Sequence, residues 1–189
     1  MSDNQSFTFP QALDEVSASS AGGSPFLIAY GVTFLITAIL SFFLPRETVA
    51  LIAIFQGGIA LPVAFWLERR MGSRRMSAEN PLKQLSGQMA FSQALALPLL
   101  ILVYSLNPGG IPLALAALGG VHFLPYSWLH RSQVYSRLAF TLAFGAFALQ
   151  VFFKSNAFNL ILLLIAIGYG ITAPIVYRHA KQLVAKGTT

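Results

Sequence analysis

The stretch FLIAYGVTFLITAILSFFL, residues Phe26–Leu44, contains no charged side chain and decides the fold class of this chain. A helix rises 1.5 Å per residue, so about 20 apolar residues cover the ~30 Å of hydrocarbon in a bilayer. Five more apolar runs follow it: Val49–Leu67, Gln88–Leu106, Ile111–Leu129, Val134–Phe153 and Phe158–Tyr177. None of the six runs contains Asp or Glu. The pattern predicts an all-α, polytopic membrane bundle of six transmembrane helices.

The composition leaves room for one membrane domain and little else. Of 189 residues, 56% are hydrophobic and 10% are charged, whereas about 25% of the residues in a typical soluble domain are charged. We divide the chain into a polar leader at residues 1–25, a six-helix transmembrane domain at 26–177 and a basic tail at 178–189. The short extramembrane segments exclude a soluble catalytic domain.

Lys and Arg are distributed unequally between the two sides that alternating spans define. Ten of the twelve fall on the side of the termini: Arg69, Arg70, Arg74, Arg75, Lys83, Arg131, Arg137, Arg178, Lys181 and Lys186. Only Arg46 and Lys154 fall on the opposite side. Because cytoplasmic loops carry an excess of Lys and Arg, both termini are predicted to be cytoplasmic. The net charge of +6 then reflects orientation and headgroup contact, and no nucleic-acid partner is expected.

The leader contains two segments of different character. Residues 10–19 fit a short helix with Pro10 in its first turn, and a partly ordered polar segment is the alternative. Residues 17–24, SASSAGGS, are interpreted as a flexible link. No signal peptide is visible, so the first apolar run is expected to act as an uncleaved insertion signal.

Short connections at residues 45–48, 107–110 and 154–157 predict three antiparallel helical hairpins. The second run of each hairpin carries glycines followed by a proline: Gly57-Gly58 and Pro62, Gly119-Gly120 and Pro125, and Gly168, Gly170 and Pro174. The pattern indicates either a three-fold internal repeat or only a compact bundle, because glycines allow close helix packing and prolines bend helices.

Polar residues within the apolar runs are the candidates for a ligand site. His122 and Tyr126 share one helical face, and we expect the His122 ring to point into the bundle beside a close helix contact at Gly119 and Gly120. The predicted ligand-binding set is His122, Tyr126, Gln56, Gln93 and Thr172. The alternative is that these side chains only hold neighbouring helices together.

A stripe of hydroxyl groups runs along the first apolar run. Tyr30, Thr33, Thr37 and Ser41 follow one another at helical spacing, so they face protein or a water-filled cavity. Ser and Thr also bond to their own backbone, which leaves cavity lining as one of two interpretations.

Several kinds of chemistry are not expected. The chain has no Cys, and no His or acid stands at ligand spacing in the core, so we predict no metal site and no cofactor. An enzyme that uses His122 as a general base oriented by Tyr126 is a third hypothesis, but no nucleophile or acid accompanies it. Ion-coupled transport is disfavoured because the runs hold no acid.

Three stretches resemble an uncharacterised family of small bacterial six-span membrane proteins: Ser24–Gly31, SPFLIAYG; Asn80–Gly87, NPLKQLSG; and Gly119–Leu129, GGVHFLPYSWL, which continues into His130-Arg131-Ser132. The resemblance covers nearly the whole chain and implies a bacterial inner-membrane location without an activity. In size alone the chain is also similar to the substrate-binding subunits of energy-coupling-factor vitamin transporters.

The favoured function is a non-enzymatic membrane protein that binds a small solute or lipid, or facilitates its passage, in a cavity between helices. The alternative is a structural or stress-response membrane protein with a packed interior and no ligand. Membrane lipids are expected partners, and a homo-oligomer or a partner membrane protein is a further possibility. The basic segment from Glu68 to Arg75 is interpreted as a headgroup anchor, with a specific anionic-lipid site as its alternative.

Overall fold

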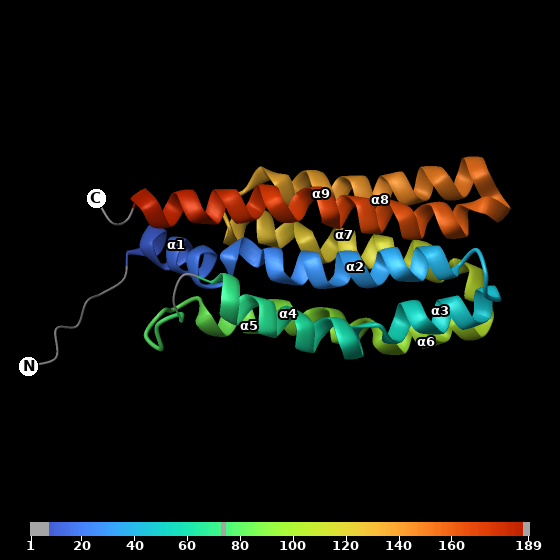
Figure 1. Cartoon of the computed structure of the whole chain (residues 1–189), viewed down its shortest axis with the longest axis horizontal. Coiled ribbons are helices and arrows are strands. Elements are labelled where there is room, and N and C mark those ends of the chain that lie inside the picture. The colour runs from blue at the N-terminus through green and yellow to red at the C-terminus, as the bar shows by residue number, and fades with distance from the viewer. Residues whose placement is uncertain (1–7, 73–74, 187–189) are drawn as a thin grey trace, which may run out of the picture.

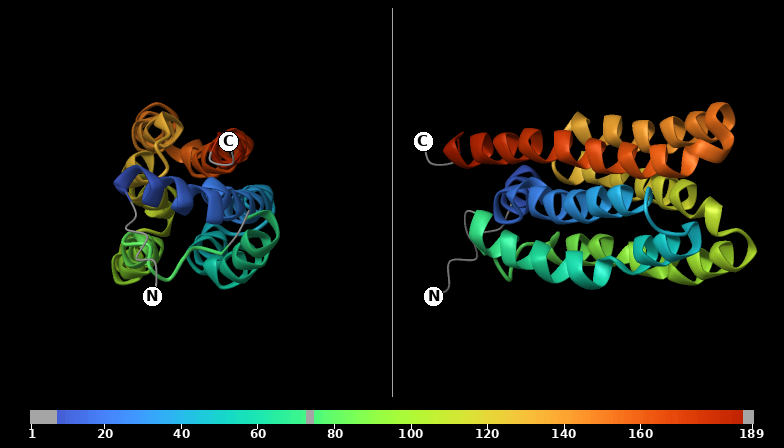
Figure 2. Two further views of the ribbon diagram at one scale, coloured as in Figure 1. Left: turned by 90° about the vertical axis from the view of Figure 1, so that its left-hand side faces the viewer. Right: turned by 45° about the vertical axis from the view of Figure 1, so that its right-hand side comes forward.

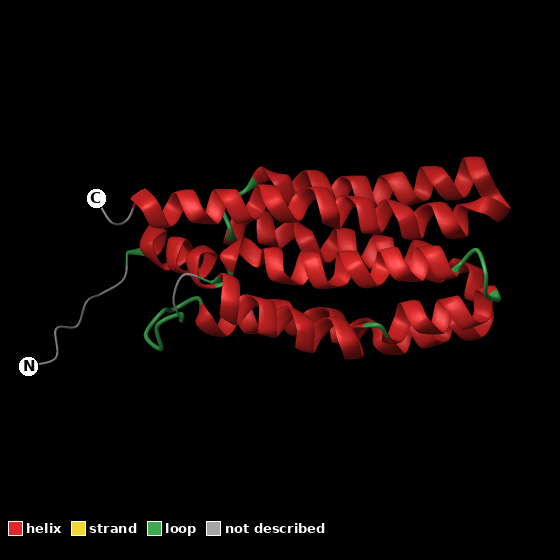
Figure 3. Ribbon diagram, viewed as in Figure 1, coloured by secondary structure: helices red, strands yellow, loops and turns green. Residues whose placement is uncertain are grey.

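The computed structural model describes residues 8–72 and 75–186 (Figure 1). Helices form nearly all of this part of the chain, and no strand occurs in it (Figure 3). The α-helices are α1 (Phe9–Ser19), α2 (Ser24–Leu40), α3 (Arg46–Phe55), α4 (Gly57–Met71), α5 (Lys83–Phe91), α6 (Leu97–Leu106), α7 (Ile111–Leu129), α8 (Gln133–Phe153) and α9 (Ala157–Lys186). The predicted all-α class is confirmed.

The longer helices run along one common axis (Figure 1). α3 continues into α4 at Gln56, and the 3₁₀ turn η2 (Ser92–Ala96) joins α5 to α6. Five continuous helical stretches are long and apolar enough to cross a membrane: Ala21–Leu40, Arg46–Met71, Lys83–Leu106, Pro108–Leu129 and Gln133–Ala185. The last stretch contains both α8 and α9, which fold back on each other at the 3₁₀ turn η4 (Lys154–Asn156).

Packing is densest in one half of the bundle. α2 packs extensively on α9, and α7 packs on α8. In addition, α8 contacts α9, and α4 contacts α2. In the end-on view of Figure 2, α8 and α9 lie at one edge and α3 to α6 at the other. α5 and η2 contain no buried residue, and α6 buries only Leu100. The helices α2, α7, α8 and α9 therefore supply most of the core, and α3 adds Val49, Ala50, Ala53 and Ile54.

The described part of the leader forms a helix that packs against the end of this core. α1 contacts α9 and α7, and it is followed by the 3₁₀ turn η1 (Ala21–Gly23). Gly22 and Gly23 have φ of 65° and 78°, a region that favours glycine. A Cβ on Gly22 would lie 2.7 Å from the Val176 carbonyl oxygen. The expectation of a flexible link at residues 17–24 is wrong, because this turn is buried against α9.

The glycines of α7 differ in how closely they meet their neighbours. A Cβ on Gly120 would lie 2.8 Å from the Ala139 carbonyl oxygen and 3.0 Å from the Ala143 Cβ, so α7 and α8 meet closely there. A Cβ on Gly119 would meet the Tyr169 hydroxyl at an ordinary 3.5 Å. The small-residue contact predicted for this pair therefore depends on Gly120.

Gly120→Leu should destabilise the protein, whereas Gly58→Leu should not. A side chain at Gly120 collides with α8 backbone, and such overpacking costs ~1–3 kcal/mol. Gly58 is exposed and has nothing within 4 Å of a built Cβ, so it is a matched control. Thermal unfolding of detergent-purified protein measures the difference. Equal midpoints for the two variants would contradict the close contact.

Candidate functional site

The structure places two of the five predicted ligand residues together. His122 and Tyr126 lie on α7 with ring centroids 5.1 Å apart, and both are half-buried. The His122 Nδ1 lies 3.1 Å from the hydroxyl oxygen of Ser92 in η2. The imidazole thus has a hydrogen-bonding partner on a neighbouring helical stretch, which is the kind of placement predicted for it.

The other three predicted residues have surroundings of their own. Gln56 is buried where α3 meets α4, and its Nε2 donates to the Ala53 carbonyl at 3.0 Å. Thr172 is buried on α9, and Gln93 is half-buried in η2. No described hydrogen bond or ring contact joins these residues to the His122–Tyr126 pair. The structure thus does not gather the five into one contact network.

The hydroxyl groups of α2 are bonded within their own helix. Thr33 Oγ1 donates to the Tyr30 carbonyl at 3.1 Å, Thr37 Oγ1 to the Thr33 carbonyl at 2.8 Å, and Ser41 Oγ to the Ala38 carbonyl at 2.6 Å. Each of these hydroxyl groups therefore has its hydrogen-bond acceptor in its own helix and needs neither a cavity nor a partner helix.

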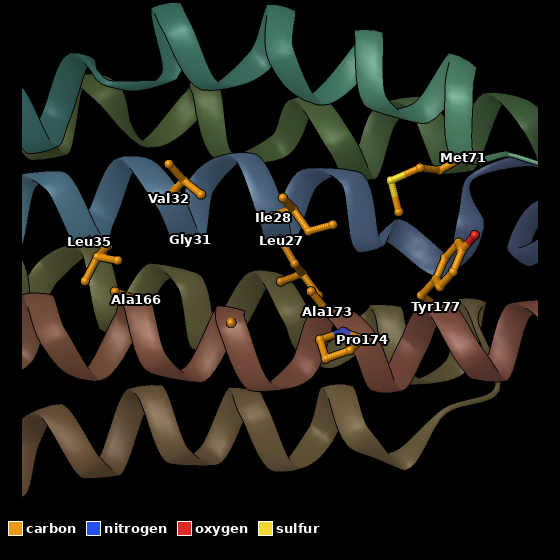
Figure 4. Close-up of a pocket in the computed structure, with 11 residues that line it drawn as sticks. Leu27, Ile28, Gly31, Val32, Leu35, Met71, Ala166, Ala173, Pro174 and Tyr177 are labelled. Atoms are coloured by element: carbon orange, nitrogen blue, oxygen red, sulfur yellow. The ribbon is translucent and has the colours of Figure 1, made fainter.

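A groove lies between α2 and α9, away from the residues singled out above (Figure 4). Its volume is about 370 Å³. The lining residues are almost all apolar: Leu27, Ile28, Gly31, Val32, Leu35, Met71, Ala166, Gly170, Ala173, Pro174 and Tyr177. None of the five predicted ligand residues lines it.

Small residues hollow out the groove. Ala166, Gly170 and Ala173 bring little side-chain volume to the side of α9 that lines the groove. Gly31 lets α2 approach α9 closely, since a Cβ there would lie 3.2 Å from the Tyr169 Cβ. A Cβ built on Gly170 meets nothing within 4 Å, so this position opens directly into free space. The spacing of small residues along one face of α9 was a usable sequence signal for the groove, whereas the Gly-Pro pattern itself indicates only a repeat or a compact bundle.

A second feature is a buried polar cluster, formed by Ser17, Gly22, His130, Tyr135 and His179, where α1 packs against the bundle. His130 is 3% exposed, and its Nδ1 lies 3.1 Å from the Ser17 hydroxyl oxygen. The Tyr135 hydroxyl donates to the Gly22 carbonyl. Burial, and secondly the neighbouring His179, lower the pKa of His130 to about 3. The imidazole is therefore neutral when α1 is docked.

Two acidic side chains attach α1 to neighbouring connections: Glu15 to the one between α4 and α5, and Asp14 to the one between α7 and α8. The Glu15 carboxylate accepts hydrogen bonds from Asn80 Nδ2 at 2.7 Å and from the Ser77 backbone N–H at 3.1 Å. Asp14 forms an ion pair with Arg131 at 3.2 Å. The sequence alone does not predict this docking of the leader, although Asn80 and His130 belong to the stretches that resemble the uncharacterised family.

The arrangement of the described residues defines a class of protein. Long apolar helices with many exposed Leu, Ile, Val and Phe side chains are those of an all-α integral membrane protein. In the described residues, no group of three or more His, Asp or Glu side chains is placed to hold a metal ion.

The chain belongs to the family of unknown function DUF7010, whose model matches residues 9–179. This match agrees with the resemblance to an uncharacterised family. No curated protein and no solved structure matched the chain.

The stability of the docked leader should fall as the pH drops below about 6.5. The pKa of His130 is lowered only in the folded state. Below pH 6.5 the His130 imidazole is therefore protonated in the unfolded chain but stays neutral in the folded protein. From the difference between pKa values of about 6.5 and about 3, the loss at pH 5 is about 2 kcal/mol. Thermal unfolding at pH 7.5 and pH 5 measures it.

His130→Gln is the control for this pH dependence, since glutamine does not titrate. The variant should lose less stability than the wild type between the two pH values, whatever its stability at pH 7.5. The same loss in both proteins would show that groups other than His130 cause the pH effect.

Proposed function

We propose that the chain is a non-enzymatic, six-span protein of the bacterial inner membrane that binds the acyl chain of a lipid in the groove between α2 and α9. The observation that carries this proposal is the groove itself, whose volume of about 370 Å³ and apolar lining suit a hydrocarbon chain. Ligand sites typically have volumes of ~300–1,000 Å³.

The distribution of polar groups favours a lipid over a polar solute. A polar solute requires several converging hydrogen-bonding groups. The groove offers only the phenol of Tyr177, and none of the five predicted polar residues lines it. His122 is hydrogen-bonded to Ser92, and the Gln56 amide nitrogen donates to the Ala53 carbonyl. Movement of the ligand across the membrane would then need facilitated passage or an energising partner protein, because the apolar runs contain no acid.

One specific observation favours a rival function. His122 is hydrogen-bonded to Ser92 of a neighbouring helical stretch, as expected of a polar residue that holds helices together. The α2 hydroxyls are bonded within their own helix and need no ligand. A structural membrane protein without a ligand would have such an interior. The two functions differ in whether purified protein retains a lipid.

Filling the groove should remove the bound lipid. Gly170→Leu places a side chain in the open space of the groove without meeting a neighbour, so the protein should fold while lipid retention falls at least about tenfold, or ~1.4 kcal/mol. Native mass spectrometry of detergent-purified protein measures retention, and Gly58→Leu is the matched control. A wild-type protein without lipid would decide for the structural rival.

The six-span topology predicts that positions 46, 108 and 155 are outside the cell. The chain has no Cys, so a single cysteine at each position can be labelled without background. A membrane-impermeant maleimide added to intact spheroplasts should react at all three positions, and a cysteine at residue 75 should react only after lysis. Labelling of position 108 only from the cytoplasm would overturn this topology.

A further inference from the structure

The two ends of the groove differ in chemistry. At one end lie Leu35 and Ala166, and at the other lie Met71 and Tyr177 (Figure 4). The Lys181 ammonium group lies 5.4 Å from the centre of the Tyr177 ring, and the exposed Arg178 follows Tyr177 directly. Positive charge is thus present at one end of the groove and absent from its lining.

Further positive charge lies on the other helix that reaches this end. Met71 is the last residue of α4, and the exposed Arg69 and Arg70 immediately precede it. The Arg70 guanidinium lies over the Trp66 ring at 4.7 Å. Among the described residues, the only ion pair joins Arg131 to Asp14, so neither Lys181 nor Arg178 forms an ion pair with a described acid.

The length of the groove fits one leaflet of a bilayer. Its α9 lining runs from Ala166 to Tyr177, which at 1.5 Å per residue is about 16 Å. This is about half of the ~30 Å hydrocarbon thickness. Tyr and Trp prefer the interface between hydrocarbon and water, so Tyr177 and Trp66 place the basic end at headgroup level.

We propose that the groove is specific for an anionic phospholipid of the leaflet that faces the basic residues. One acyl chain lies along Ala173, Gly170 and Ala166, and the phosphate of the headgroup lies between Lys181 and Arg178. This inference rests on the proposed lipid-binding function and adds the class of headgroup. A neutral lipid fills the same groove but leaves the two cations without a net negative partner.

The test compares two lipids with identical acyl chains, one with an anionic and one with a zwitterionic headgroup. Wild-type protein is delipidated and offered equal amounts of phosphatidylglycerol and phosphatidylcholine with identical chains, and native mass spectrometry counts the bound molecules. We expect a preference for phosphatidylglycerol of about fivefold or more, the effect of one Lys or Arg near an anionic surface. Lys181→Gln and Arg178→Gln should each reduce this preference and leave phosphatidylcholine binding unchanged.

Lys83→Gln is the matched control, since Lys83 is exposed at the start of α5 and does not line the groove. It should retain the wild-type preference. Equal binding of the two lipids by the wild type, or an unchanged preference in both groove-end variants, would overturn the headgroup inference while the lipid-binding function stands. Binding of neither lipid, or a dimer in place of a lipid adduct, would overturn both.

Discussion

Every backbone N–H and C=O in an apolar environment needs a partner within the protein, and this constraint governs the whole chain. It explains why the described residues are helical almost throughout, including both sides of the Gln56 break and the η2 turn. Polar side chains in the apolar environment also need hydrogen-bond partners within the protein. Thr33, Thr37 and Ser41 donate to carbonyls of their own helix, and Gln56 donates to the Ala53 carbonyl. Polar residues that looked like the lining of a cavity are largely bonded where they stand.

Small residues have two opposite consequences in this bundle. At Gly120 the missing side chain lets α7 approach the α8 backbone near Ala139, which makes the contact tight. At Gly170 the missing side chain faces no neighbour, which leaves the groove between α2 and α9 open. Both positions hold the same residue type, glycine. Whether a glycine closes a contact or opens a site depends on which helix lies opposite it.

The sequence predicted those features that depend on neighbours along the chain. The apolar run Ile111–Leu129 coincides with α7, and the run Val134–Phe153 differs from α8 by one residue at its start. The groove was not predicted, because α2 and α9 lie far apart in sequence and periodicity does not show which faces meet. The docking of α1 was missed for the same reason, since Glu15 pairs with Asn80 and Ser17 with His130. The turn at residues 17–24 looked flexible from its composition, and only its tertiary contacts order it.

The anchoring of α1 also has a consequence for the order in which the helices reach their final positions. Ser17 leaves the ribosome 113 residues before its partner His130. At ~5–20 residues per second, the leader waits roughly 6 to 23 seconds before Ser17 can meet His130. Asn80 appears in the meantime and offers Glu15 an earlier attachment. α1 is therefore synthesised well before α7 and α9, the helices on which it docks, and cannot reach its final position until both have formed.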